Sequence, residues 1–200
     1  AALRAGSADR VVDAWDGELT AAAATLDRLR QAFCKALEGA LQPLAESVLL
    51  PGGVSVDYRR GWPLEPSERH LADWLQAGRL QDRQQGHTRL GPHRADFRIH
   101  IGGRPLAEAL SRGQQKLLVI ALLLAQAELY RRHRGDTCIL LIDDLPAELD
   151  LANRARVMSA LAALDSQLFV TAIEPHLLDT ATWSEARTFH LAHGALAEMV

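Results

Sequence analysis

The sequence predicts an α/β fold in which a parallel sheet and its covering helices follow a mainly helical first part. From residue 87 onward, short apolar runs of strand length alternate with helical patterns, which is typical of a parallel sheet with crossover helices. The run over residues 138–142 is continuously apolar, as expected of a central strand covered on both faces. Before residue 87 the apolar spacing is mostly helical. We therefore expect two regions, residues 1–86 and residues 87–200.

The composition limits the classes of protein to which the chain can belong. Its 200 residues are 48% hydrophobic, which is enough for the core of one domain with or without an appendage. The net charge is −3, so any contact with nucleic acid must come from a local patch. The sequence shows neither a signal peptide nor an apolar stretch long enough to cross a membrane, and we expect no membrane association.

The cysteines and the first residues carry two smaller predictions. Cys34 and Cys138 lie far apart within apolar runs, which predicts reduced thiols in the core of a cytosolic protein. The chain opens with the letters AALR instead of a methionine, and we expect it to be part of a longer protein.

The first 86 residues carry one long and one short helical pattern. Apolar side chains at helical spacing predict an amphipathic helix from about residue 8 to residue 49, with a bend at Pro43. Alternation over residues 54–58 predicts a short strand. A second helix is predicted from about residue 68 to residue 81, with Ser67 as its N-cap. The simplest interpretation of the two helices is a packed helical hairpin.

The remaining elements alternate between strand and helix. Residues 97–101 alternate between apolar and polar side chains and predict a strand that ends in a tight turn. Residues 117–125 are apolar nearly all round, so this helix is expected to be buried on most sides. A helix over residues 151–164 and a strand over residues 167–171 follow the central strand, and residues 187–199 predict a closing hairpin.

Two adjacent carboxylates, Asp143 and Asp144, give the strongest chemical signal because they end the apolar run. Ligands of open α/β folds bind at the carboxyl ends of the strands, where two neighbouring carboxylates repel each other unless a cation or a shared proton is present. This arrangement is the Walker B pattern, in which the first Asp holds Mg²⁺ and the second acidic group orients or deprotonates the attacking water. The alternative is a strand that stops at a solvated acidic turn.

Ser111 and Gly113 lie directly before the apolar helix. A hydroxyl, free backbone N–H groups and the positive end of the helix dipole together suit an anion such as phosphate. The alternative is that Ser111 is an ordinary helix N-cap and that Arg112 and Lys116 form a solvated face.

The order of the motifs carries a specific resemblance. The letters LSRGQ at residues 110–114, a helix, a strand ending in two aspartates, and the letters ELD at residues 148–150 resemble the signature motif, Walker B motif and D-loop of ABC-type ATPase heads. The form of these motifs, preceded by GPHRAD at residues 91–96, is similar to that of the RecF family. The resemblance covers the whole chain and implies a helical arm over residues 1–86 and the C-terminal half of an ATPase head over residues 87–200.

The resemblance implies roles for individual residues. Asp143 would be the carboxylate associated with Mg²⁺, through water, and Asp144 would be the catalytic residue that activates water, at a position where most ABC proteins have Glu. Ser111 and Gly113 would touch the γ-phosphate of an ATP molecule held by the opposite subunit. The other residues that the resemblance places near the nucleotide or the dimer interface are Arg112, Gln114, Asp150 and Thr171.

Two features depart from the common pattern of ABC proteins. Ala172 stands where many transporters have a switch histidine, and Thr171 would partly substitute for it. The sequence contains no G-x-x-x-x-G-K-[ST] phosphate loop, so this loop, its lysine and the adenine pocket are expected in a segment outside this chain. The chain is therefore expected to hold only half of each ATP site.

The resemblance also implies a function for the whole protein. ATP would join two heads into a homodimer on double-stranded DNA beside gaps, and hydrolysis would release it. RecR would be the partner, and RecA loading with RecR and RecO would follow. The process would be recombinational repair and the SOS response, in the cytoplasm at the nucleoid. The alternatives are another head of the Rad50, SMC or RecN kind, with a longer arm, or a non-catalytic dimerisation or DNA-scaffold module that no longer uses ATP.

The residues that would contact DNA are less well defined by the sequence. Phosphate contacts require positive charge but no motif. The arginines considered for this role are Arg59, Arg60, Arg79, Arg83 and Arg89. Two interpretations stay open for His93 and Arg94, which either meet nucleotide or DNA or satisfy the ends of strands.

Overall fold

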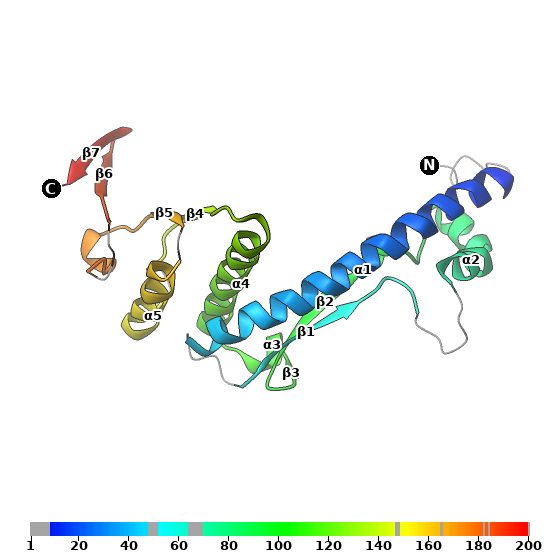
Figure 1. Ribbon diagram of the computed structural model, residues 1–200, viewed down its shortest axis with the longest axis horizontal. Helices are drawn as coiled ribbons and strands as arrows, with labels where there is room; N and C mark the ends of the chain where they lie inside the picture. Colours follow the sequence, from blue (N-terminus) through cyan, green and yellow to red (C-terminus); the bar gives the residue numbers. More distant parts are fainter. Residues whose placement is uncertain are drawn as a thin grey trace. The chain divides into compact units, whose positions relative to one another are not determined.

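The fold is described from a computed structural model of the chain (Figure 1). It describes residues 9–47, 52–63, 70–146, 149–164, 166–181, 183 and 185–199. These described residues form two compact units, the first within the ranges Ala1–Ala36 and Ser55–His100 and the second within Leu37–Val54 and Ile101–Val200. The boundaries between the units lie after Ala36, Val54 and His100, and not at residue 86. The long helix Asp9–Ser47 contributes to both units. The division into an arm and a head stays a prediction about function.

The long predicted helix is confirmed as α1, Asp9–Ser47, which has 39 residues. It continues through Pro43, and the bend predicted there stays a prediction. The predicted first residue, Ala8, and the last two, Val48 and Leu49, lie outside the described residues. After α1 comes the predicted strand, β1, Val54–Arg59, in which buried or half-buried positions alternate with exposed ones.

The second helix, α2, spans Leu71–Gln85 and therefore starts and ends later than predicted. Its N-cap is His70, whose backbone is extended. The backbone N–H of His70 donates a 2.8 Å hydrogen bond to the carboxylate of Asp73. The predicted cap, Ser67, lies outside the described residues. The helix continues to Gly86, where a left-handed φ of 71° ends it, since only glycine adopts this conformation without a steric penalty.

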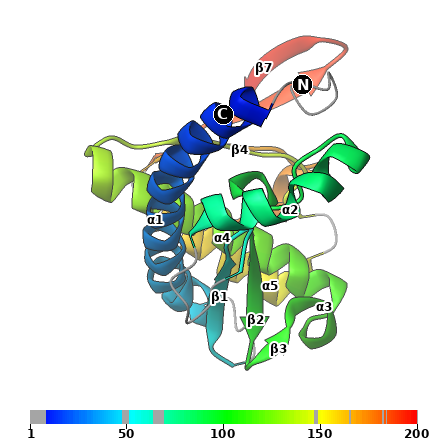
Figure 2. The same cartoon turned by 90° about the vertical axis from the view of Figure 1, so that its right-hand side faces the viewer.

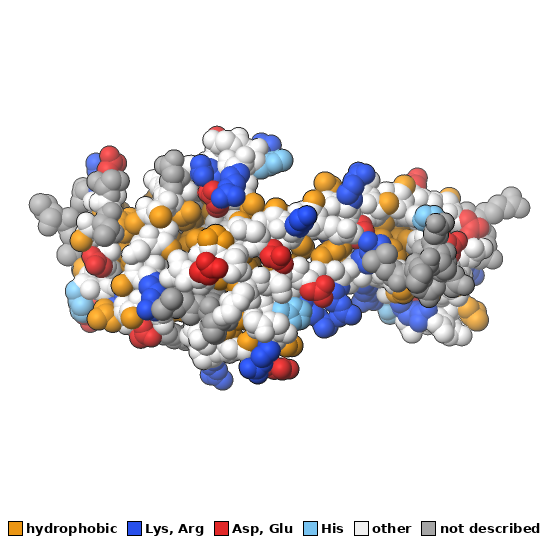
Figure 3. All heavy atoms as spheres, turned by 60° about the horizontal axis from the view of Figure 1, so that its bottom comes forward, with side chains coloured by type: hydrophobic (Ala, Val, Ile, Leu, Met, Phe, Trp, Pro, Cys, Tyr) orange, Lys and Arg blue, Asp and Glu red, His pale blue; other side chains and the backbone are white. Residues whose placement is uncertain are grey.

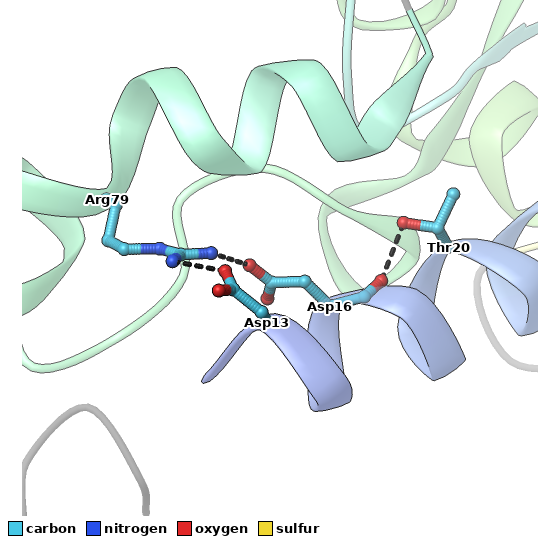
Figure 4. A network of polar contacts seen from close by, with 4 residues as sticks. All are labelled: Asp13, Asp16, Thr20 and Arg79. Carbon is cyan, nitrogen blue, oxygen red and sulfur yellow. Dashed lines mark hydrogen bonds and ion pairs between the residues drawn. The ribbon is translucent and has the colours of Figure 1, made fainter. Parts of the chain in front are cut away.

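Within the first unit, α1 and α2 pack together as the sequence predicts. The buried residues Ala23, Leu71 and Leu75 form one apolar cluster, with Leu19, Trp62 and Leu90 packed against it. Beside this cluster, the guanidinium of Arg79 on α2 bridges two carboxylates of α1 (Figure 4). It pairs with Asp13, and its Nη2 lies 2.6 Å from Oδ2 of Asp16. The hydrogen bond to Asp13 raises the pKa of Arg79.

Removing the charge of Arg79 tests how much this bridge stabilises the first unit. We expect Arg79→Met, measured by thermal unfolding of the full-length protein, to lower the free energy of unfolding by about 1–2 kcal/mol, because Asp16 then loses its partner. Arg59→Met, at an exposed position of β1, is the matched control, and its free energy of unfolding should stay within about 0.5 kcal/mol of the wild-type value. Equal losses in the two variants would show that the bridge contributes nothing specific.

A second polar cluster in the first unit surrounds Asp27, which is only 8% exposed. Its carboxylate accepts hydrogen bonds from the hydroxyl of Tyr58 at 3.0 Å and from Nε2 of Gln31 at 2.8 Å, and it pairs with Arg60 at 3.1 Å. Burial raises the pKa of Tyr58, and the hydrogen bond to Asp27 raises it further. A buried carboxylate is stable only when paired in this way, so the cluster ties α1 to the end of β1.

The described residues form three sheets. One has the strand order β1-β2-β3 (Figure 2), with β2 at Asp96–Ile101 and β3 at Arg104–Pro105 across the predicted turn at Gly102 and Gly103. The second unit also contains two two-stranded sheets, parallel β4-β5 and antiparallel β6-β7. The helices and strands that follow β3 in the chain are α3 Leu106–Ala109, α4 Arg112–Arg134, β4 Ile139–Ile142, α5 Leu151–Ala162, β5 Gln167–Val170, β6 Thr188–Ala192 and β7 Ala195–Met199. Short 3₁₀ turns lie at Pro92–Arg94 and Pro175–Leu177.

This arrangement confirms the α/β class, the parallel pairing and the closing hairpin. The second unit buries apolar side chains from the end of α1 and from both of its longer helices. They include Leu37, Leu41, Leu117, Leu118, Val157 and Leu161. Cys34, in the first unit, is buried as predicted, and burial raises the pKa of its thiol, whereas Cys138 in the second unit is half-buried.

The prediction that β4 is covered on both faces is wrong for the described residues. Ile139 and Leu141 are 63% and 78% exposed, and Phe169 of β5, paired with Leu141, is 53% exposed. These three residues share one face because side chains alternate along a strand. The other face, with Leu140 and Ile142, is half-buried. In the part of the chain described, this sheet has two strands, and its face with Ile139, Leu141 and Phe169 is exposed.

The prediction for the apolar helix is also only partly correct. Helix α4 buries most of its apolar residues, but Val119 and Leu123, four residues apart on one face, are 54% and 53% exposed. The helix therefore has one apolar stripe that the described residues leave open. Within the same described ranges, no helix has the length and apolar character needed to cross a membrane.

Candidate functional site

The parallel pairing of β4 and β5 brings three predicted site residues together. Asp143 and Asp144 follow β4, and Thr171 follows β5, at the carboxyl ends of the two paired strands. The hydroxyl of Thr171 donates a 2.6 Å hydrogen bond to Oδ1 of Asp143. The same hydroxyl accepts a 2.8 Å hydrogen bond from the backbone N–H of Asp144. This group lies where ligands bind in open α/β folds.

The backbone around these residues is fixed on both sides of Thr171. The N–H of Thr171 donates to the carbonyl of Ile142 at 2.9 Å, and the N–H of Leu145 donates to the carbonyl of Thr171 at 3.2 Å. Asp144 has a φ of 46°, in the left-handed region that Asp and Asn enter more readily than other side chains. The sharp turn gives the two carboxylates different surroundings, since Asp143 is exposed and Asp144 is half-buried.

The donor chemistry of this group fits the expected cation. Mg²⁺ prefers oxygen ligands and is usually held by one or two carboxylates, together with water and substrate phosphates. Asp143 offers such a carboxylate at the exposed sheet edge, with Oδ1 held by Thr171. The residues present therefore fit a magnesium–nucleotide complex.

The predicted signature motif lies at the beginning of α4. Ser111 is the N-cap, and its hydroxyl accepts a 3.4 Å hydrogen bond from the N–H of Gln114. In return, Oε1 of Gln114 accepts a 2.9 Å hydrogen bond from the N–H of Ser111. The alternative of an ordinary cap is thus realised, although both Ser111 and Arg112 are exposed and accessible to a ligand. Gly113 is half-buried in the first turn.

Asp150 caps the next helix, a role that the sequence analysis missed. Its Oδ1 accepts a 2.8 Å hydrogen bond from the N–H of Asn153, and its Oδ2 accepts a 2.9 Å hydrogen bond from the Asn153 side chain. An Asp directly before a helical pattern is the sequence signal for such a cap. In the predicted D-loop, Ala147 and Glu148 lie outside the described residues.

Arg154 is another residue that no motif identified. Its guanidinium donates hydrogen bonds of 3.4 Å to the carbonyl of Leu149 and to the carbonyl of Leu177. Leu149 itself is buried. Arg154 therefore holds the end of the predicted D-loop in place from the first turn of α5.

Comparison with known proteins identifies the family. The RecF/RecN/SMC N terminal domain family matches residues 20–194. The chain belongs to this family. It is 40% identical over 196 residues to the DNA replication and repair protein RecF of Thioalkalivibrio sulfidiphilus, a match that covers 98% of this chain and 54% of that protein.

Two further matches support the predicted resemblance to RecF, which is confirmed. The RecF protein of Pseudomonas paraeruginosa is 38% identical over 199 residues, which are 98% of this chain and 53% of that protein. A solved structure of the recombination mediator protein RecF-ATPrS in the RecFOR pathway matches with a TM-score of 0.76 at 18% identity, over 98% of this chain and 52% of that one. This structural match shows the fold, and the chain spans about half the length of the curated relatives.

Within the described part of this RecF/RecN/SMC family chain, the predicted site residues fall into separate groups. Asp143, Asp144 and Thr171 are joined by hydrogen bonds. The residues of the predicted signature motif and D-loop make no hydrogen bond to these three in the described ranges. They are Ser111, Arg112, Gly113, Gln114 and Asp150. Their roles in nucleotide binding stay predictions.

Several arginines considered for DNA contact have structural partners in the first unit. Arg60 pairs with Asp27, Arg79 bridges Asp13 and Asp16, and Nε of Arg89 lies 2.8 Å from Oδ1 of the buried Asp82. On the face seen in Figure 3, basic side chains are interspersed with acidic ones.

These structural partners change which arginine is the best candidate for a contact with DNA. Arg59, exposed on β1, is better suited to a phosphate contact than the paired arginines. His93 has a ring nitrogen 2.9 Å from the carbonyl of Thr88, which favours its structural interpretation.

Proposed function

We propose that this chain is the C-terminal half of an ATP-binding head of the RecF type. In the whole protein, ATP binding would join two heads on double-stranded DNA near gaps, and hydrolysis would release them. The observation that carries this proposal is the pair Asp143 and Asp144 at the end of β4, held by Thr171 at the end of β5. The order of the motifs and the membership of the family support it.

The residues of the chain divide the chemistry between them. Bound Mg²⁺ would supply positive charge that neutralises the phosphate oxygens. Asp143 would hold the water ligands of this cation, and Asp144 would orient the attacking water and accept its proton. Asp is one methylene shorter than the Glu common at this position, so either the attacking water lies closer or hydrolysis is slow. Ser111 and Gly113 would meet the γ-phosphate held by the other subunit.

The proposed partners follow from the resemblance to RecF. We propose RecR as a direct partner, with RecO and RecA acting downstream in recombinational repair, and a location in the cytoplasm at the nucleoid. The neighbouring structure that is described as a recombination mediator in the RecFOR pathway supports the process. Arg59 is the first candidate for a DNA phosphate contact.

The open apolar faces are consistent with this proposal. The curated relatives are about twice as long as the matched segment. We infer that residues of the full-length protein beyond this chain cover Ile139, Leu141 and Phe169 and continue the sheet of β4 and β5. An apolar face of this kind is costly in water, at roughly 25 cal/mol per Å² of apolar surface.

A dimerisation module without ATP use is the competing function. It would keep the fold but would not need the two carboxylates or Ser111 in these positions. Sedimentation of the full-length protein with ATP, with ADP and without nucleotide separates the two functions. The proposal expects dimers with ATP only, whereas a constitutive dimer or a monomer under all three conditions would contradict it.

The isolated chain should neither hydrolyse ATP nor bind it tightly. The reason is that the sequence lacks the phosphate loop and its lysine, which supply most of the phosphate contacts in P-loop enzymes. Equilibrium binding of a fluorescent ATP analogue and release of phosphate measure the two quantities. Steady turnover by the isolated chain, abolished by Asp143→Ala, would overturn the assignment of a composite site.

A further inference from the structure

Thr171 has an unusual position among the predicted site residues. The resemblance places it near the nucleotide, where it would partly substitute for the switch histidine absent at Ala172. In the structure it lies 28 residues after Asp143 in the chain, and its hydroxyl hydrogen-bonds both of the neighbouring aspartates. Its backbone is paired on both sides, with Ile142 and Leu145.

We propose that Thr171 is a positioning residue that fixes the carboxylate of Asp143 against the backbone of Asp144, and not a residue that contacts the nucleotide. This inference rests on the proposed function, because it concerns the residues that would act on the magnesium–nucleotide complex.

The number of protons on the hydroxyl carries the argument. A threonine hydroxyl has one proton to donate and two lone pairs to accept with. The proton of Thr171 points to Oδ1 of Asp143 at 2.6 Å, a distance typical of strong hydrogen bonds to carboxylates. One lone pair accepts from the N–H of Asp144. Ionised phosphate oxygens only accept hydrogen bonds, so Thr171 cannot serve a phosphate without releasing Asp143.

The same hydrogen bonds give the aspartates a defined arrangement. Oδ1 of Asp143 is held, while Oδ2 accepts no hydrogen bond from the described residues and remains free for an outside ligand. Asp144 adopts its left-handed φ of 46° with its N–H bound to Thr171. Thr171 thus links the carboxylate that would serve the cation to the turn that presents the second carboxylate.

Thr171→Val is a suitable test because it keeps the branched shape and removes only the hydroxyl. Thr171 is exposed and its backbone pairing does not depend on its side chain, so the fold should tolerate the change. Thr171→Ser restores a hydroxyl, and Thr188→Val, on the exposed strand β6, is the matched control. All variants are made in the full-length protein.

The first measurement needs no ligand. Hydrogen–deuterium exchange of the nucleotide-free protein reports on the N–H of Asp144. We expect faster exchange at this amide in Thr171→Val, and wild-type exchange in Thr171→Ser and Thr188→Val. Unchanged exchange in Thr171→Val would overturn the proposal, because the hydrogen bond would then not form in solution.

The second measurement separates the cation from the nucleotide. Paramagnetic resonance measures the affinity for Mn²⁺, used in place of Mg²⁺, in the presence of a non-hydrolysable ATP analogue, and fluorescence measures the affinity for the analogue without metal. We expect Thr171→Val to weaken Mn²⁺ binding about 10-fold, the loss of one charge-assisted hydrogen bond, and to leave metal-free nucleotide affinity unchanged. Thr171→Ser should restore the wild-type values.

The outcomes distinguish this inference from the proposed function. In an Asp143→Ala background, Thr171→Val should cause no further loss of Mn²⁺ affinity, because its target is gone. Weaker metal-free nucleotide binding with unchanged Mn²⁺ affinity would identify Thr171 as a nucleotide contact and overturn the inference while leaving the function intact. A wild-type protein that binds neither the analogue nor Mn²⁺ would overturn both.

Discussion

Asp144→Asn in the full-length protein should preserve ATP binding and slow hydrolysis by on the order of 10²-fold or more. The substitution keeps the size of the side chain and removes the negative charge that would orient water and accept its proton. Slow hydrolysis should leave a long-lived ATP-bound dimer that stays on DNA. Steady-state phosphate release and the lifetime of the dimer in sedimentation experiments measure both effects.

The structure makes this substitution a clean test. Asp144 meets Thr171 through its backbone N–H and not through its carboxylate, so the hydrogen bond survives in the variant. Its left-handed φ of 46° is also accessible to Asn. Asp136→Asn, at an exposed position before β4, is the matched control for loss of one negative charge. Wild-type turnover in Asp144→Asn would assign the activation of water to another residue.

Periodicity and motif order predicted the elements of the fold well because both depend on local sequence. The helix α1 and the alternation of strand and helix after residue 87 follow from the spacing of apolar side chains. The start of α2 was less predictable. Ser67 is the better capping residue by type, but the chain turns into the helix only at His70, where Asp73 provides the hydrogen bond.

Burial was harder to predict because it depends on residues distant in the chain or outside it. The apolar run ending in Ile142 predicts cover on both faces, and the described residues leave Ile139 and Leu141 open. This chain corresponds to about half the length of its curated relatives, and burial by residues outside it cannot be deduced from an apolar pattern. The position of the strand was therefore predicted correctly, and only its burial differs in the described residues.

The candidate site, like the fold, was only partly predictable from the sequence. Asp143 and Asp144 were identified from sequence because they are adjacent and follow a recognisable strand. The contact of Thr171 with both was not, because it arises only when the parallel register places the ends of β4 and β5 side by side. The arginine bridges were missed for a similar reason, since nothing in the sequence near Arg79 indicates Asp13 and Asp16 as its partners.

Ser111→Arg in the full-length protein should still bind ATP and should fail to dimerise. If Ser111 meets the phosphate held by the other subunit, an arginine there would remove the hydroxyl and push into the interface between the heads. The protein's own phosphate loop would be unaffected, so ATP binding by a single subunit should remain. Sedimentation with ATP, with ADP as the control, measures the loss of the dimer.

The helix cap seen in the structure requires a separate control. Ser111 forms a capping box with Gln114, so Ser111→Ala should lower the free energy of unfolding by about 0.5–2 kcal/mol through the lost cap alone. Thermal unfolding of both variants shows how much of any defect is loss of stability. If Ser111 is only a cap, Ser111→Arg should dimerise with ATP as tightly as the wild type does at a temperature where both are folded.

Mixing two defective proteins shows that the defect acts between subunits. When Ser111→Arg is mixed with a variant that lacks only its phosphate-loop lysine, one of the two composite sites in the mixed dimer stays whole. That site joins the intact loop of the Ser111→Arg subunit to the intact serine of the other subunit. We expect the mixture to form more ATP-dependent dimer than either variant alone. A mixture with no more dimer than its components would remove Ser111 from the interface and leave it as a helix cap.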